Sequence, residues 1–286
     1  EPGIAARYQV GMFLADHATI LNPLRYVQAM AAAYASAGGR IVRAGVDGLR
    51  PEDGRWRLQG PTESPFDHVV VADVGDIVEG FENVSSQART NCLSLMDQVD
   101  VASTEFWKTI KLAEKFGPVD VLSIPSNHCQ WRKGKGLIGK PNDDWGLHIS
   151  RRLERLNEEA GLQASFHRPA DDWDETLSFK IRGSVLGLAH GHQAKNPAGI
   201  IPWWKNQKHE GRLLCEVLLT GHFHYPSFRP SGRDPVTGKS SYHIQASTLD
   251  NGSAWVRNTM GEDGDPALTV FAINDDGFDL RSFALL

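Results

Sequence analysis

The sequence predicts an α/β domain preceded by a smaller α+β segment, and three observations carry this prediction. The chain has 286 residues, more than one small core requires, which favours one large or two modest domains. After Ala72, short apolar runs alternate with amphipathic stretches, which is the pattern of a layered α/β domain. Nine of the eleven histidines lie between His128 and His243, so the chemistry is expected in the second part.

Composition and charge are those of an ordinary globular protein. Hydrophobic residues make up 41% and charged residues 23%, and no stretch approaches the roughly 18 apolar residues of a membrane span. The net charge of -5 excludes a protein that coats nucleic acid through a global basic field. The three dispersed cysteines argue against a disulfide scaffold, and the first residues carry no signal-peptide pattern, so a cytoplasmic protein is expected.

The first segment, residues 1–72, carries start and stop signals for one helix and several strands. Asn22 and Pro23 are typical of a helix start, and Gly38-Gly39 is typical of its end. The remaining expectations are a strand at 41–46, a turn at 51–54, a short return strand at 56–58 and a buried strand at 68–72. The second predicted domain covers residues 73–286.

In the second domain, strand, loop and helix are expected to repeat. Two amphipathic helices are predicted, with apolar faces formed by Phe106, Ile110 and Ala113 in the first and by Ile149, Leu153 and Leu156 in the second. The second helix should begin near Asp144 and stop at Gly161. Strands are expected at 119–124, 177–181, 185–189, 216–220, 242–246 and 267–273.

Four polar residues come directly after short apolar strands: Asp76, Asn127, His190 and His222. In α/β proteins the carboxyl ends of the strands gather the functional site. Carboxylate, amide oxygen and imidazole are ligands for a divalent metal such as Mn²⁺, Fe²⁺ or Zn²⁺. The pattern therefore predicts metal-assisted hydrolysis.

Four motifs in order resemble those of the calcineurin-like metallophosphoesterases: Gly75-Asp76-Ile77-Val78-Glu79-Gly80, Ser126-Asn127-His128, His190-Gly191-His192 and Gly221-His222-Phe223-His224. The resemblance covers about residues 69–286 and implies that family's layered α/β sandwich. It implies that Asp76 bridges two metal ions, that Asn127, His190 and His222 complete one site, and that His224 belongs to the other. His128 would protonate the leaving group or stabilise the attacked phosphoryl group. In that family two ions about 4 Å apart share the work of catalysis.

One motif of that family is missing upstream. The family opens with Asp-x-His on a first strand, whereas this chain has only the adjacent pairs Asp16-His17 and Asp67-His68. Neighbouring side chains of a strand point to opposite faces, so neither pair easily places both groups on one ion. The first βα unit is therefore expected to be absent, with one metal site complete and the other incomplete.

The upstream segment resembles part of the substrate domain of FAD-dependent amino-acid oxidoreductases. The residues that carry this resemblance are Phe13-Leu14-Ala15-Asp16-His17, Leu21-Asn22-Pro23-Leu24, Gly38-Gly39-Arg40-Ile41-Val42-Arg43 and Asp67-His68-Val69-Val70-Val71-Ala72. The dinucleotide fingerprint of such enzymes is absent from this segment, so FAD is not expected to bind. The chain is thus interpreted as a fusion joined near residue 72.

A basic rim is predicted near the metal site. Arg132, Lys133 and Lys135, with Trp203 and Trp204, could hold a phosphate backbone and stack bases. The alternative is that the tryptophans pack as a lid and the lysines are solvated. The run from Gly134 to Gly139 matches a dinucleotide fingerprint by letter, but no strand precedes it, so the match is interpreted as accidental.

The leading hypothesis is a metal-dependent hydrolase of a phosphomono- or phosphodiester, impaired by the missing motif and similar to the phage and nuclease branches of its family. Its substrate would be a phosphate ester, with nucleic acid as one candidate and no membrane partner. The alternatives are an FAD-dependent oxidoreductase fragment, or a catalytically dead phosphoesterase fold that binds a partner.

Overall fold

A computed structural model describes residues 68–81, 91–134, 136–233, 238–249 and 265–286, and the backbone of two strands at 48–52 and 55–59. Those two strands, β1 (Gly48–Glu52) and β2 (Arg55–Gln59), form an antiparallel hairpin. The predicted return strand at 56–58 is therefore confirmed, but its partner includes Pro51, which was expected in the turn. The helix expected after Asn22 and the strand at 41–46 lie outside the described residues.

Residues 69–286 contain the alternation that the sequence predicts for the second domain, and the strand expected at 68–72 of the first segment belongs, with Val119–Ser123, to one sheet of this domain. Its helices are α4 (Leu95–Ala113), α5 (Trp145–Glu159) and α6 (Ile200–His209), with a short 3-10 turn, η1, at Pro197–Gly199. Its strands are β3 (Val69–Asp73), β4 (Val119–Ser123), β5 (Arg132–Lys133), β6 (Gly136–Leu137), β7 (Ser165–His167), β8 (Thr176–Ile181), β9 (Ser184–Ala189), β10 (Val217–Thr220), β11 (Ser227–Arg233), β12 (Ser240–Gln245), β13 (Thr269–Asn274) and β14 (Gly277–Leu285). None of the described helices is both long enough and apolar enough to span a lipid bilayer.

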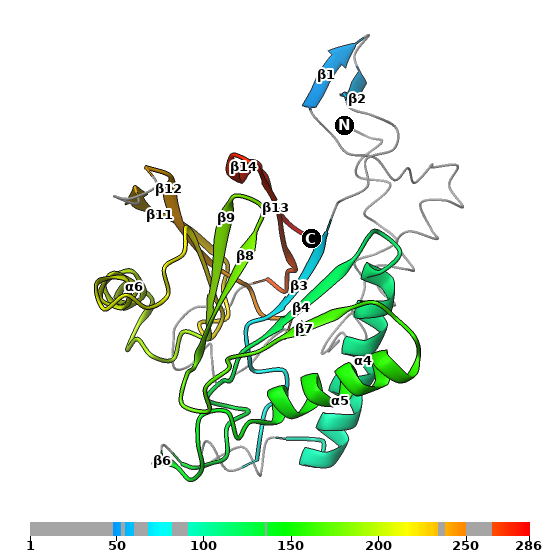
Figure 1. The fold of residues 1–286 in the computed structure, drawn as a ribbon, viewed down its shortest axis with the longest axis vertical. Helices are drawn as coiled ribbons and strands as arrows, with labels where there is room; N and C mark the ends of the chain where they lie inside the picture. Colours follow the sequence, from blue (N-terminus) through cyan, green and yellow to red (C-terminus); the bar gives the residue numbers. More distant parts are fainter. Residues whose placement is uncertain are drawn as a thin grey trace.

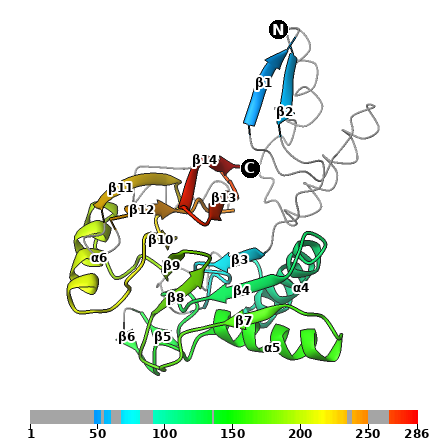
Figure 2. The same cartoon turned by 45° about the horizontal axis from the view of Figure 1, so that its top comes forward.

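Two sheets form the middle of this domain. One has the order β3-β4-β7 with all strands parallel, and the other has the order β11-β12-β10-β9-β8, parallel at its centre and antiparallel at both edges. Figure 1 shows α4 and α5 outside the first sheet and α6 outside the second, so four layers follow one another. Figure 2 shows the β13–β14 hairpin beside β11 and β12. The predicted layered α/β architecture is confirmed.

Three buried clusters hold these layers together. The first lies between α4, α5 and the three-stranded sheet and contains Phe106, Ile110, Ala113, Ile149 and Leu153. The second lies between α6 and the five-stranded sheet, and the third fills the space between the two sheets, where Leu122 and Ile124 meet Leu186, Leu188 and Ile244. Burial of apolar surface in these three layers is the main stabilising force of the domain.

Helix α5 differs from its predicted apolar face in one position. Asp144 is its N-cap, as expected, and its side chain accepts the amide of Leu147. Leu156, however, is 40% exposed, and Asn157 takes the buried position of the last turn. The Asn157 amide donates to the carbonyl oxygens of Leu162 and Ala164, which lead into β7.

Candidate metal centre

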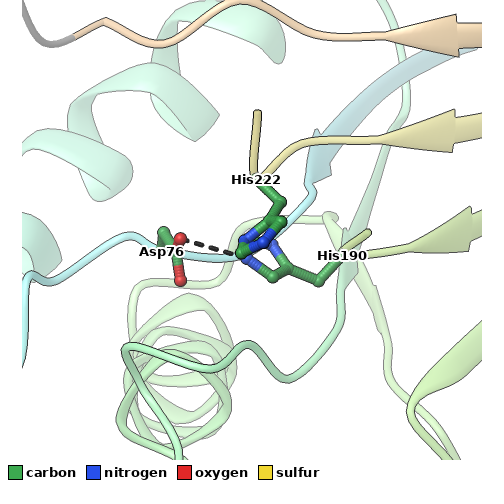
Figure 3. A group of neighbouring side chains, drawn as sticks. All are labelled: Asp76, His190 and His222. Carbon is green, nitrogen blue, oxygen red and sulfur yellow. Dashed lines mark ion pairs between the residues drawn. The ribbon is translucent and has the colours of Figure 1, made fainter. Parts of the chain in front are cut away.

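The two sheets place three potential ligands side by side at the carboxyl ends of their strands. Asp76 follows β3 in the three-stranded sheet, and His190 and His222 follow β9 and β10 in the five-stranded sheet. One ligand atom from each lies within 4.8 Å of the other two (Figure 3). Within the described part of the chain, this is the one group of three or more neighbouring Asp, Glu, His or Cys side chains that could hold a metal ion.

The backbone at these positions adopts an unusual conformation. Asp76 has φ 56° and His222 has φ 70°, both in the left-handed region that residues other than glycine rarely occupy. His224 shares it, with φ 62°. Such residues cluster at functional sites, where the surrounding structure maintains the strain.

Gly75 shows how closely the two halves of the site approach each other. A Cβ added to Gly75 would lie 2.5 Å from the Cβ of Ser126 and 2.7 Å from Nδ1 of His190, and its φ is 96°. No other residue fits there without moving the sheets apart, which explains the glycine before Asp76.

The hydrogen bonds of His190 define its free nitrogen. Nδ1 lies 2.7 Å from the carbonyl oxygen of Val74, and because a carbonyl only accepts, Nδ1 carries the proton. In the neutral ring Nε2 then carries a lone pair. This atom is buried and lies 3.0 Å from Oδ2 of Asp76, at ion-pair distance but without hydrogen-bond geometry to any described residue.

That arrangement fits a divalent cation. Two acceptors 3.0 Å apart, one on the buried His190 and one on the half-buried Asp76, repel each other unless a proton or a cation lies between them. Without a cation, burial opposes the charge of His190 but the Asp76 carboxylate outweighs it and raises the pKa of His190. A cation satisfies both lone pairs at once, and the Val74 carbonyl fixes the ring as a second partner does for many metal-bound histidines.

Asp76 is held as a carboxylate. Burial disfavours its charge, but the neighbouring His190 and the hydrogen bonds around it keep the pKa of Asp76 far below its usual range. Its amide donates to Oγ of Ser126 at 2.8 Å, and its Oδ1 accepts the amide of His128 at 3.2 Å. Burial, followed by the positive field of His190, lowers the pKa of His222 to about 3, so His222 is neutral and able to donate a lone pair.

The loop that contains Asn127 lies against Asp76. Its neighbours Ser126 and His128 both bond to Asp76, and the side-chain oxygen of Asn127 is buried. The structure therefore brings together the loops that carry the four predicted ligands. The role of Asn127 as a ligand stays a prediction.

His128 faces the same site from the same loop. Its Nδ1 lies 3.0 Å from the carbonyl oxygen of Glu79 and 3.4 Å from Oε2 of Glu79. Burial lowers the pKa of His128, but Glu79 and the Asp76 carboxylate outweigh burial and raise it to about 9. The ring is 19% exposed, so it remains within reach of solvent or substrate.

The second predicted ion has fewer supporting contacts in the described part of the chain. His224 is not a member of the cluster formed by Asp76, His190 and His222, and its assignment to another ion stays a prediction. His68 directly precedes β3, at the amino-terminal end of the strand and away from the ligands that follow its carboxyl end. Its Nδ1 lies 3.2 Å from Oδ2 of Asp120. Asp16, His17 and Asp67 lie outside the described residues.

Two supporting residues were missed by sequence reasoning. Asp144 was predicted only as a helix start, yet its Oδ2 also accepts the amide of Ser126 at 3.0 Å and so positions the loop of the site. Asp73, at the end of β3, has one buried oxygen with no hydrogen bond to any described residue. Burial raises the pKa of Asp73 to about 6, against the hydrogen bond from Gly75. In the sequence, Asp144 has the pattern of an ordinary helix cap and Asp73 that of an ordinary strand end, so no local signal distinguishes either residue as part of the site.

The predicted basic rim is corrected at one position. Trp204 is 1% exposed, donates its Nε1 to the carbonyl oxygen of Leu213 and has Lys208 over its ring, so it belongs to the core and offers no face to a base. Trp203 is half-buried and packs against the same core cluster, and the alternative of a lid over the site stays a prediction. Arg132 donates to Oε1 of Gln130, and Lys133 is exposed.

The glycine-rich run that matched a dinucleotide fingerprint follows β5, so the expectation that no strand precedes it is wrong. The run leads into antiparallel β6 and not into a helix, which agrees with an accidental match. Lys135 lies outside the described residues.

Comparison with known proteins gives separate matches for the two parts of the chain. Residues 1–75 match the family FAD dependent oxidoreductase, which confirms the upstream resemblance over 75 of the 286 residues. No curated protein matches the chain.

Several solved structures are similar to the chain. Among them, wild-type Vps29 of Entamoeba histolytica complexed with Zn²⁺ is 18% identical, with 72% of this chain and 86% of that chain covered and a TM-score of 0.35. Vacuolar protein sorting 29 of Cryptosporidium parvum is 16% identical, with 77% and 95% covered and a TM-score of 0.32. A predicted phosphoesterase of Streptococcus pneumoniae is 12% identical, with 64% and 90% covered and a TM-score of 0.30. At these values the likeness says nothing about the activity of this chain.

Proposed function

We propose that residues 69–286 form a metal-dependent phosphoesterase domain that hydrolyses a phosphomono- or phosphodiester. The observation that carries the proposal is the group of Asp76, His190 and His222, with a lone pair of His190 fixed toward the Asp76 carboxylate. An oxygen ligand, two imidazoles and the predicted amide oxygen of Asn127 suit Mn²⁺, Fe²⁺ or Zn²⁺. Bound there, such an ion would supply a Lewis acid for the phosphoryl group and a means of ionising water near neutral pH.

The chain's own residues have distinct tasks in this proposal. Asp76, His190 and His222 orient the reacting centre, with Asn127 as the fourth ligand. His128, whose backbone is bonded to Asp76 and whose ring is fixed by Glu79, donates a proton to the leaving oxygen or stabilises the phosphoryl charge. His224 would serve a second, incomplete site. Arg132, Lys133 and Lys135 would contact phosphate groups of the substrate.

Metal binding and hydrolysis test the proposal separately. Metal-free protein is titrated with Mn²⁺ by calorimetry, and hydrolysis of p-nitrophenyl phosphate and bis(p-nitrophenyl) phosphate is followed by absorbance. Asp76→Asn and His222→Ala should abolish both signals, because each removes a ligand. His209→Ala removes an exposed imidazole at the end of α6 and should change neither.

The outcomes distinguish the alternatives. Absence of Mn²⁺ binding by the wild-type protein would overturn the metal centre. Binding of Mn²⁺ without hydrolysis of either ester would overturn the catalytic assignment and favour a binding protein with this fold.

A further inference from the structure

Glu175 is the centre of a polar cluster that the proposed metal centre does not include. It directly precedes β8, and its Oε1 accepts the side-chain amide of Gln130 at 2.6 Å. Its Oε2 accepts the side-chain amide of Gln193 at 3.3 Å, and its Oε1 lies 3.5 Å from Nε2 of His192. One carboxylate therefore contacts three side chains from two other loops.

These two loops belong to different sheets. Gln130 lies on the loop after β4 of the three-stranded sheet, two residues beyond His128. His192 and Gln193 lie on the loop after β9 of the five-stranded sheet, two and three residues beyond His190. The proposed ligands divide in the same way, with Asp76 from one sheet and His190 and His222 from the other.

The contacts on both sides are buried or half-buried and continue toward the ligands. Gln130 is 1% exposed, and its Oε1 accepts both Nε and Nη2 of Arg132. Gln193 accepts the amide of Gly191 at 3.0 Å. The His192 ring centroid lies 5.5 Å from that of His190 and 6.2 Å from that of His222.

The charge of Glu175 matches its partners. Burial opposes its ionisation, but the hydrogen bonds from His192, Gln130 and Gln193 outweigh burial and lower the pKa of Glu175 to about 2. The carboxylate is thus present throughout the physiological range, and hydrogen bonds to a charged acceptor are the stronger kind.

We propose that Glu175 is a positioning residue that joins the two halves of the metal centre, by anchoring the Ser126–Gln130 loop of one sheet to the Gly191–Ala194 loop of the other. The effect of this connection, which is to fix the spacing of the metal ligands, rests on the proposed function. Metal ligation requires the donor atoms of both halves at fixed separations, so a looser connection should weaken binding.

Hydrogen exchange of the metal-free protein tests the connection without any ion. Glu175→Gln keeps the shape of the side chain but replaces one acceptor oxygen by an amide that faces other donors. Amides of both loops, 126–130 and 191–194, should exchange about tenfold faster, because a charged hydrogen-bond network is lost. The matched control is Asp174→Asn, an exposed neighbour whose carboxylate accepts only from Thr176 in the described structure, and it should leave both loops unchanged.

A second variant keeps the carboxylate. Gln130→Ala removes the hydrogen bond between Glu175 and the loop of the three-stranded sheet. Glu175 is then less fixed, so the backbone amides of residues 191–194, on the loop of the other sheet, should exchange faster. Unchanged exchange at 191–194 in both Glu175→Gln and Gln130→Ala, or faster exchange only at 171–176, would overturn the proposal.

The metal arm separates positioning from general stability. In Glu175→Gln the dissociation constant for Mn²⁺ should rise about tenfold and the visible absorption bands of bound Co²⁺ should shift, while Asp174→Asn keeps both. Identical Co²⁺ bands in Glu175→Gln and wild type would count against a role in ligand spacing. The hydrogen-exchange experiment needs no ion, so it decides the role of Glu175 whether or not the wild type binds Mn²⁺. A wild type that binds no Mn²⁺ would overturn the proposed function and not the connection made by Glu175.

Discussion

Replacing Asp144 should destabilise the domain more than an ordinary helix cap does. Its Oδ1 caps α5 through Leu147, and its Oδ2 accepts the amide of Ser126, whose own hydroxyl accepts the amide of Asp76. The carboxylate is 4% exposed, so water cannot replace it. One side chain thus joins a helix start to the loop of the metal centre.

The magnitude follows from the two bonds. Loss of an N-cap costs about 1 kcal/mol, and a buried amide left without an acceptor costs about 2 kcal/mol more. Asp144→Ala should therefore lower the free energy of unfolding by about 3 kcal/mol. Asp144→Asn retains one acceptor and should cost about 2 kcal/mol. Ser94→Ala removes the exposed N-cap of α4 and should cost only about 1 kcal/mol.

Urea denaturation followed by circular dichroism measures these differences, and calorimetry measures the effect on Mn²⁺ binding. Asp144→Asn should also weaken Mn²⁺ binding, because the Ser126 amide loses its acceptor and the loop with Asn127 shifts. The reasoning is refuted where Asp144→Ala costs no more than Ser94→Ala, since the bond to Ser126 would then contribute nothing.

Three further outcomes are expected. The purified chain should show no flavin absorbance after dialysis, and stoichiometric FAD would contradict the interpretation of the upstream segment as a fragment without its nucleotide anchor. Calorimetry should give one Mn²⁺ per chain and hydrolysis well below that of a two-metal enzyme; two ions bound tightly would mean that ligands outside the recognised motifs complete the second site. Burial raises the pKa of Asp73 to about 6, so between about pH 4 and 6 the folded protein keeps a proton that the unfolded chain has released. The free energy of unfolding of the wild type should therefore fall as the pH rises from about 4 to 6. Asp73→Asn should escape this loss and gain up to about 3 kcal/mol relative to wild type well above pH 6 in urea denaturation, whereas Asp276→Asn, an exposed control that keeps Asp73, should follow the wild-type pH dependence.

Sequence periodicity predicted most of the second domain because its strands and helices bury regular faces. Phe106, Ile110 and Ala113 are all buried on α4, as the 3.6-residue spacing requires. The elements that were missed lack this regularity. Helix α6 buries only Ile200 and Trp204 among its ten residues, and β11 contains a proline, a glycine and two arginines.

The positions of the ligands were predictable for a topological reason. Residues that follow neighbouring parallel strands meet at the carboxyl end of a sheet, which groups His190 and His222. Asp76 follows a strand of the other sheet, and the packing of the two sheets brings it to them. The supporting contacts were not predictable, because Asp144 and Glu175 act across 18 and 45 residues of sequence on Ser126 and Gln130. Nothing in a local pattern indicates which distant loop a carboxylate contacts.

The left-handed backbone at Asp76, His222 and His224 links the fold to the proposed chemistry. Each of these positions would be less strained with glycine, and strain of this kind costs of order 1–3 kcal/mol per residue. Glycine, however, has no donor atom. A turn that must present a carboxylate or imidazole shortly after a strand can do so only by keeping a side chain in that region, and at Asp76 the backbone amide is held by Oγ of Ser126. Three of the five left-handed residues other than glycine in the described chain, Asp76, His222 and His224, thus lie at proposed ligand positions.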